Sequence, residues 1–171
     1  MKKVRSEISG IVFSIPWLIA KDHGLFEAEG IDMEFIKAQG NRSTTRTENP
    51  DEVNPILNHV PFEDNQVSIY RAWEEGQVRR AYESKQGAKV IALRSAVMSQ
   101  AVLVMPDSPH NYPGTLGNKP VGVTFHAAAH YVALRLLEGY VPNEKIKLVH
   151  YGSPKARFEA MLNGEVDACV V

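Results

Sequence analysis

Cysteine is almost absent from this chain, because Cys169 is the one cysteine among 171 residues. A single thiol forms no internal disulfide and cannot build a multi-cysteine metal or iron–sulfur site. Cys169 lies in the apolar run 168–171, which predicts a buried strand cysteine and not an exposed nucleophile. The sequence therefore excludes disulfide scaffolds and cysteine-cluster metal centres built from this chain.

A long apolar run and an excess of positive charge are missing as well. No stretch of about 18 apolar residues occurs, so we expect no membrane-spanning helix and a peripheral membrane role at most. The formal net charge is −1, which argues against nucleic acid as a partner. The basic residues 1–5 and the apolar residues 11–20 imitate a signal peptide, but no small-residue cleavage site follows, and we interpret both as structural.

The motifs of several common enzyme and nucleotide-binding classes do not occur. The chain contains no G-x-S-x-G, P-loop, G-x-G-x-x-G or C-x-x-C motif. His126 and His130 have the spacing of zinc ligands on a helix, yet no glutamate follows His126 and no third ligand is evident. We therefore predict no cofactor, no metal ion and no committed catalytic set.

Alternating strand and helix patterns are what the sequence does contain. Residues 15–36 start at Pro16 with a helical period, and change after Gly30 to the alternation of a strand with one buried face. We expect an apolar strand at 8–14 to precede them. Further along, we expect a polar loop at 38–51, a helical turn at 51–58, a short strand at 67–70, an exposed helix at 73–84, and strands at 89–93 and 100–105.

The last third of the chain has the clearest pattern. Strands are predicted at 120–125, 146–150 and 166–171, with an amphipathic helix over 129–137 and a second helix after Ser153 as N-cap. Phe158, Met161 and Leu162 are the predicted buried stripe of that second helix. Short loops between these elements imply parallel strands. The prediction is an α/β fold with two lobes, 6–93 and 100–171, joined by a hinge at 94–99.

Three segments resemble the type II periplasmic-binding-protein superfamily. They are GLFEAEGIDMEFI at 24–36, PDSPHNYPGTLGNKPVGVT at 106–124 and YGSPKARFEAMLNGEVDACVV at 151–171. The resemblance is to the branch of aliphatic-sulfonate-binding proteins and thiamine-precursor synthases. It implies a two-lobe fold with parallel-rich sheets, in which the chain returns to lobe one after 166–171. We therefore expect the C-terminal part of lobe one and a second hinge strand to be missing, and the piece to be marginally stable.

The resemblance also implies a function. We expect the substrate-binding protein of an ABC importer, which closes on a small anionic organic solute (a sulfonate, a carboxylate or a pyrimidine-like molecule) and then docks on a membrane permease. Such a protein is periplasmic or at the cell surface if a signal peptide has been removed, and cytoplasmic otherwise.

Candidate ligand residues follow from position, since ligands of open parallel sheets bind beyond the carboxyl ends of the strands. The loop 124–130 leads into a helix N-terminus that favours an anion, and an arginine between two aromatic residues suits a carboxylate or sulfonate. For each residue, helix capping, core packing or surface pairing is the alternative interpretation, and for Arg71 the surface partners are Glu74 or Glu75. The predicted ligand-binding residues are Ser14, Trp17, Tyr70, Arg71, Arg94, Ser95, Thr124, His126, His130 and Ser153.

An intracellular enzyme on the same fold is the alternative function. Desulfinases of this superfamily use a cysteine near the first strand–helix turn with a histidine and an arginine, and residues 11–16 contain no cysteine. Thiamine-precursor synthases use a cysteine-rich iron-binding segment and a lysine–histidine pair, and Cys169 alone does not supply that segment. A ligand-sensing module of a regulator is a third possibility. We therefore favour binding over catalysis.

Overall fold

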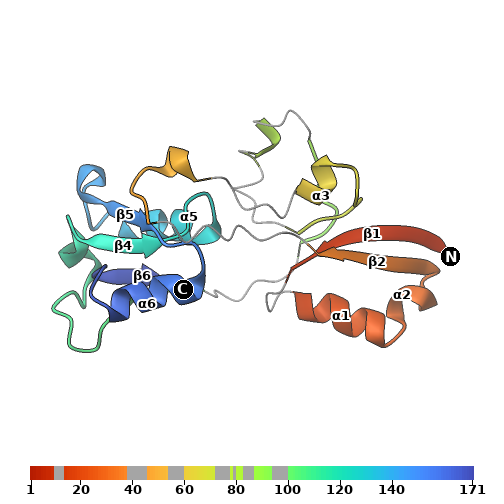
Figure 1. Cartoon of the computed structure of the whole chain (residues 1–171), viewed down its shortest axis with the longest axis horizontal. Coiled ribbons are helices and arrows are strands. Elements are labelled where there is room, and N and C mark those ends of the chain that lie inside the picture. The colour runs from red at the N-terminus through yellow and green to blue at the C-terminus, as the bar shows by residue number, and fades with distance from the viewer. Residues whose placement is uncertain are drawn as a thin grey trace. The chain divides into compact units, whose positions relative to one another are not determined.

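The chain forms two compact units, which are described separately (Figure 1). The structure, a computed structural model, describes residues 1–9, 14–37, 46–53, 60–71, 78, 80–82, 87–93 and 100–171. Unit 1 comprises Met1–Gly40 and Ile56–Glu74, and unit 2 comprises Asn41–Pro55 and Glu75–Val171. The predicted hinge at 94–99 lies outside the described residues, so the lobe boundaries remain a prediction.

Unit 1 contains a parallel pair of strands covered by helices. Strand β1 (Lys2–Ile8) pairs along its whole length with β2 (Ile31–Lys37). Helices α1 (Ile15–Asp22) and α2 (Leu25–Ala28) run beside this pair in Figure 1. Gly24 separates the two helices with a φ of +68°, a left-handed conformation that glycine adopts without strain. The predicted helix–strand corner is confirmed.

The first strand lies earlier in the chain than the sequence predicted. The prediction was 8–14, of which residues 10–13 lie outside the described part of the chain, whereas β1 ends at Ile8. The first half of β1 is basic, so the apolar pattern did not reveal it as a strand. Its charges are tolerated in the sheet because they have a partner on the neighbouring strand. Lys3 Nζ lies 3.2 Å and Arg5 Nε 2.9 Å from Glu34 Oε2 on β2. Cross-strand pairs of this kind stabilise a solvent-facing surface of a sheet.

The middle of the chain also differs from the prediction. A 3₁₀ turn at Pro50–Glu52 overlaps the start of the helical turn expected at 51–58, and the rest of that turn lies outside the described residues. Helix α3 (Val60–Glu63) follows. The strand expected at 67–70 is a single parallel bridge between Ile69 and Ser6. The strand expected at 89–93 is wrong: these residues have no regular secondary structure and pair with no strand of the described chain, and Leu93 is 88% exposed. An apolar run becomes a strand only where a neighbour satisfies its backbone groups. The helix expected at 73–84 lies largely outside the described residues.

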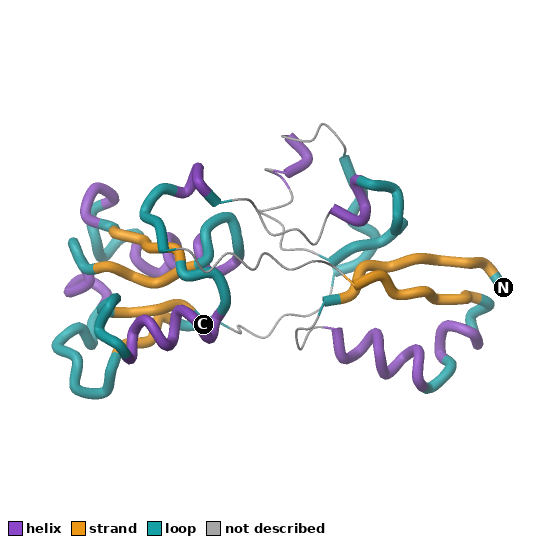
Figure 2. Tube along the Cα trace, viewed as in Figure 1, coloured by secondary structure: helices purple, strands orange, loops and turns teal. Residues whose placement is uncertain are grey.

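Unit 2 is a four-stranded sheet with helices beside it (Figures 1 and 2). The strands are β3 (Val102–Val104), β4 (Pro120–Val123), β5 (Lys147–His150) and β6 (Ala168–Val170), in the order β3-β6-β4-β5. Strand β4 runs parallel to both of its neighbours, as predicted, and β3 runs antiparallel to β6. Helix α5 (Ala128–Leu137) follows β4, and α6 (Pro154–Leu162) follows β5. Short 3₁₀ turns at Pro113–Leu116 and Asn143–Lys145 complete the unit.

The core of unit 2 surrounds β4 and β6, both of which are buried. Cys169 is fully buried in β6, as predicted, and burial raises the pKa of its thiol. The predicted stripe of α6 is partly wrong. Met161 is buried, but Phe158 is 41% and Leu162 52% exposed, and the buried face consists of Arg157, Ala160 and Met161. A buried arginine therefore takes an inward position that the apolar pattern assigned to other residues.

The segment 46–53 belongs to unit 2, although it precedes that unit's sheet by about 50 residues. Thr47 forms an antiparallel bridge with His150 at the end of β5, and the His150 amide donates to the Thr47 carbonyl at 2.8 Å. Val53 is buried in the core with residues of β4 and α5. This segment therefore extends the β5 edge of the sheet.

Candidate functional site

In unit 1 the structure brings together three of the predicted ligand residues, Ser14, Trp17 and Arg71. Arg71 Nη2 donates to Ser14 Oγ at 3.0 Å, and its guanidinium carbon lies 6.0 Å from the centre of the Trp17 ring. Ser14 is the N-cap residue of α1, but its side chain makes no capping bond; the hydroxyl donates to the Ser9 carbonyl at 2.5 Å. The Ser14 oxygen is therefore an acceptor for the arginine, and its proton is already used.

A buried carboxylate that the sequence did not reveal anchors this arginine. Glu7 Oε2 lies 3.4 Å from both the backbone nitrogen and Nη2 of Arg71, and the Glu7 side chain is fully buried. Burial raises the pKa of the Glu7 carboxyl, although the charge of Arg71 acts in the opposite direction. Glu7 Oε1 is buried and has no hydrogen-bond partner among the described residues. Because Glu7 lies in β1, outside every loop at a strand end, loop position gave no signal for it.

The two aromatic candidates of unit 1 pack against other aromatic side chains. Trp17 contacts Phe26 and Phe35 at centroid distances of 5.9 and 6.4 Å. Tyr70 packs on Phe62 at 4.9 Å, and burial raises the pKa of its hydroxyl. Trp17 therefore combines core packing with the contact to Arg71. The candidates Arg94 and Ser95 lie outside the described residues.

In unit 2 the candidates Thr124 and His126 lie between β4 and α5, and His130 lies in the first turn of α5. All of 121–127 is buried, and His126 has a φ of +61°, which is uncommon for a residue other than glycine. The amides of Ala128 and Ala129, in the first turn of α5, have no acceptor within the described part of the chain. Unpaired amides at a helix N-terminus suit an anion.

Histidine rings accept hydrogen bonds from the neighbouring amides of this loop. The amide of His126 donates to His130 Nδ1 at 3.2 Å, and the amide of Phe125 donates to His150 Nδ1 at 3.1 Å. His126 Nε2 lies 2.7 Å from the carbonyl of Pro50, in the segment 46–53. His150 was missed as a candidate because it ends a strand. No group of three His, Cys, Asp or Glu side chains within the described residues is placed to hold a metal ion.

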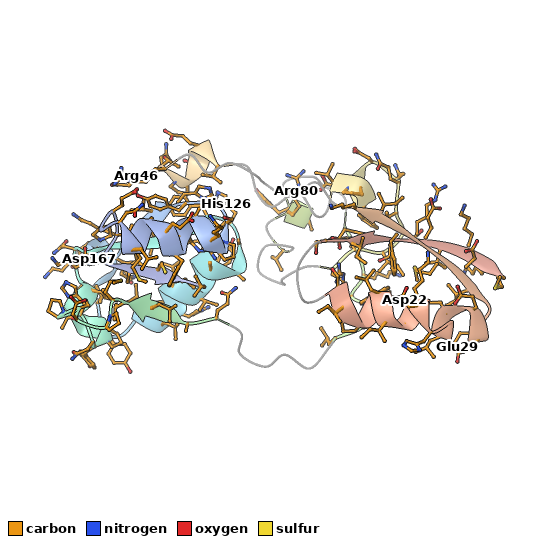
Figure 3. All side chains as sticks on the ribbon, turned by 60° about the horizontal axis from the view of Figure 1, so that its bottom comes forward. Asp22, Glu29, Arg46, Arg80, His126 and Asp167 are labelled. Atoms are coloured by element: carbon orange, nitrogen blue, oxygen red, sulfur yellow. The ribbon has the colours of Figure 1, made fainter. Side chains whose placement is uncertain are left out.

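Segment 46–53 makes a second polar contact with the rest of unit 2. Arg46 Nε donates to Tyr151 Oη at 3.1 Å, and Tyr151 Oη donates to Glu165 Oε2 at 3.0 Å. Burial raises the pKa of the Tyr151 hydroxyl, and the bond to Glu165 acts in the same direction. Arg46 and His126, which both contact this part of unit 2, are labelled in Figure 3.

The last candidate, Ser153, is a helix cap. Its side-chain oxygen accepts the amide of Ala156 at 3.1 Å, as expected for the residue before Pro154. Because proline has no amide hydrogen, this cap leaves little donor capacity at the start of α6. The structure adds Arg157 beside it, a buried arginine that contacts Thr124 and Gly152. An arginine in an otherwise amphipathic helix gave no sequence signal for burial.

The architecture is that of type II periplasmic binding proteins, as the resemblance implied. One solved structure with this fold is the periplasmic aliphatic sulphonate binding protein SsuA from Escherichia coli, with a TM-score of 0.71 and 17% identity over 100% of this chain. The alkanesulfonate-binding protein SsuA from Xanthomonas axonopodis pv. citri, bound to MOPS, gives 0.67 and 16% over 100%. A mutant of ArgBP from T. maritima gives 0.56 and 13% over 99%.

The chain spans 54% of the length of each SsuA protein. No family model and no curated protein sequence matches it. None of the described helices has the length and apolar character needed to cross a membrane. At these identities the likeness establishes the fold, while the ligand and the partners are matters for the proposal that follows.

Proposed function

We propose that this chain is a solute-binding protein, or part of one, that serves an ABC-type importer and takes a small organic anion. The observation that carries this proposal is the fold likeness to sulfonate- and amino-acid-binding proteins, which extends over the whole chain. A periplasmic or cell-surface location and a membrane permease as partner belong to the same proposal.

Two features of the described residues support an anionic solute. In unit 1, Arg71 is anchored by Glu7 but keeps about a fifth of its side chain exposed (21%) next to Trp17. In unit 2, the first turn of α5 offers the amides of Ala128 and Ala129, which donate to no acceptor of the described residues. A guanidinium and helix-start amides are common partners for carboxylates and sulfonates in proteins. Closure of the predicted hinge on binding remains a prediction of the proposal.

Calorimetric titration with a panel of aliphatic sulfonates, carboxylates and amino acids tests this function. We expect at least one panel member to bind, and Arg71→Lys to weaken it by about tenfold or more, because lysine keeps the charge but loses the forked donor geometry. Arg71→Ala is less informative because it leaves Glu7 buried without its partner. Arg5→Lys, an exposed arginine of the same unit, is the matched control and should leave the affinity unchanged.

Binding of no panel member would rule out the proposed function. Binding that Arg71→Lys leaves unchanged would keep the function and remove Arg71 from the site.

A further inference from the structure

Arg157 is a buried arginine whose side chain joins the carboxyl ends of three parallel strands. It is 4% exposed. Its Nε donates to the Val170 carbonyl at the end of β6 at 2.6 Å, and Nη1 donates to the Gly152 carbonyl, just after β5, at 2.6 Å. Nη1 also donates to Thr124 Oγ1, just after β4. One guanidinium therefore holds together the carboxyl ends of these strands, which is where ligands bind in open α/β sheets.

No carboxylate among the described residues balances the charge of this guanidinium. All three of its acceptors are neutral oxygens, and no described acidic residue forms an ion pair with it. Burial lowers the pKa of Arg157 to about 10, so the side chain still carries its charge at neutral pH. Burying a charge without a counter-ion is costly. A neutral side chain with N–H groups, such as glutamine, could donate to these oxygens without the cost of burying a charge. The positive charge of Arg157 therefore requires an explanation of its own.

A second feature connects this guanidinium to the start of α5. The three hydrogen bonds of Arg157 use Nε and Nη1, and one of them goes to Thr124, just before α5. Side chains of a helix lean toward its N-terminus, which brings the head group of Arg157 back to the strand ends. Thr124, which accepts from Arg157, also accepts the amide of Ala127 through its carbonyl at 3.3 Å. Thr124 therefore links the guanidinium to Ala127, the residue that precedes the first turn of α5.

We propose that Arg157 is a positioning residue that gives unit 2 its preference for an oxyanion: it holds Thr124 and Gly152 in place, and its uncompensated charge favours a negative group at the Ala128 and Ala129 amides. This inference rests on the proposed function for its biological meaning. The class of ligand it selects is a sulfonate or carboxylate, in preference to a neutral molecule of the same shape.

Methanesulfonate and methanesulfonamide form a suitable pair of probes, since they have similar shapes and differ in charge. Each would be titrated into the ¹⁵N-labelled full chain while the amide resonances of Ala128 and Ala129 are followed. We expect the wild-type protein to bind methanesulfonate at least tenfold more tightly. Arg157→Gln should reduce that ratio by about tenfold, because it removes a positive charge close to the start of α5.

Two further variants separate charge from structure. Arg157→Lys keeps the charge but cannot reach all three oxygens, so both affinities should fall while their ratio is retained. Arg135→Gln removes an exposed arginine of α5, with a side chain 78% exposed, and should leave the ratio unchanged. Circular dichroism and thermal unfolding verify that each variant is folded. A merely structural Arg157 would lower the unfolding temperature of its variants and leave the ratio of affinities intact.

The outcomes are distinct from those of the proposed function. A wild-type ratio near one, a ratio unchanged in folded Arg157→Gln, or a ratio lost in folded Arg157→Lys would each overturn the inference. If Arg157→Gln does not fold, the wild-type and Arg157→Lys ratios still decide. If solutes of the panel bind but the amide resonances of Ala128 and Ala129 do not respond to methanesulfonate, the function stands and the inference fails. Binding of no panel solute, methanesulfonate included, would instead rule out the proposed function itself.

Discussion

At the scale of single residues, two buried charges distinguish this protein from a simple α/β core. Glu7 and Arg157 both lie in regular elements whose apolar neighbours dominate the sequence pattern. Glu7 has a cationic partner in Arg71, whereas Arg157 is surrounded by neutral acceptors. Each residue is costly to bury, and each contacts a predicted ligand residue: Arg71 in unit 1 and Thr124 in unit 2.

Glu7 should make the stability of the protein fall as pH rises. Its pKa in the folded state is raised above the ordinary value of 4.5, so the folded protein holds this proton more tightly than the unfolded chain. The free energy of unfolding therefore decreases as pH rises from 4.5 through the folded-state pKa. Glu7→Gln removes this titration. Urea unfolding at a series of pH values should show the wild-type protein losing stability relative to Glu7→Gln over that interval.

Glu34 is the control of opposite sign. Hydrogen bonds from Arg5 and Lys3 hold the pKa of this exposed carboxyl below 4.5. Its contribution to stability is present above 4.5 and is lost as pH falls through the lower value, so the wild-type protein should lose stability relative to Glu34→Gln on acidification. If the stability of the wild type relative to Glu7→Gln stays constant or increases as pH rises, the assignment for Glu7 is contradicted.

At the scale of elements, local signals predicted helix starts better than strand positions. Ser153 before Pro154 is both the predicted and the observed start of α6. A cap is a local interaction between a side chain and amides two or three residues away, so the sequence contains all of it. Strand β1 and residues 89–93 show the contrast. The basic segment forms a strand beside β2, which supplies Glu34, whereas the apolar segment pairs with no strand of the described chain.

Replacing Ser153 tests the capping role directly. Ser153→Ala should lower the free energy of unfolding by about 1 kcal/mol, because the amide of Ala156 loses its acceptor. Ser153→Asp retains an acceptor at the same position and should remain within about 0.5 kcal/mol of the wild type. Urea unfolding followed by circular dichroism measures both. Equal losses in the two variants would mean that the hydroxyl has a role other than capping.

At the scale of the whole molecule, the two units differ in how much apolar surface they bury. Unit 2 contains two clusters of buried side chains, which include residues of β4, β6, α5 and α6. Among the described residues of unit 1, the buried large apolar side chains are Met33 and Val67. Because buried apolar area dominates stability, the units should open with different free energies.

Hydrogen exchange followed by mass spectrometry measures this difference. Peptides from β4 and β6 should exchange at least tenfold more slowly than peptides from β1 and β2, since strands in a large buried core open last. Peptides from the 3₁₀ turn Asn143–Lys145, which is exposed within unit 2, are the internal control and should exchange fast. Equal protection of β1 and β4 would show that the chain opens as one cooperative unit.

The sequence by itself determined the α/β class, the helix–strand corner around Gly24 and Gly30, the parallel strands β4, β5 and β6, and the buried position of Cys169. These features depend on periodicity, caps and turns, which are interactions over a few residues. Only the tertiary structure decided that Glu7 anchors Arg71, that segment 46–53 joins unit 2, and that Arg157 joins three strand ends. Each of these depends on a partner far away in the chain, and the environment that makes a buried charge tolerable exists only once the chain has folded.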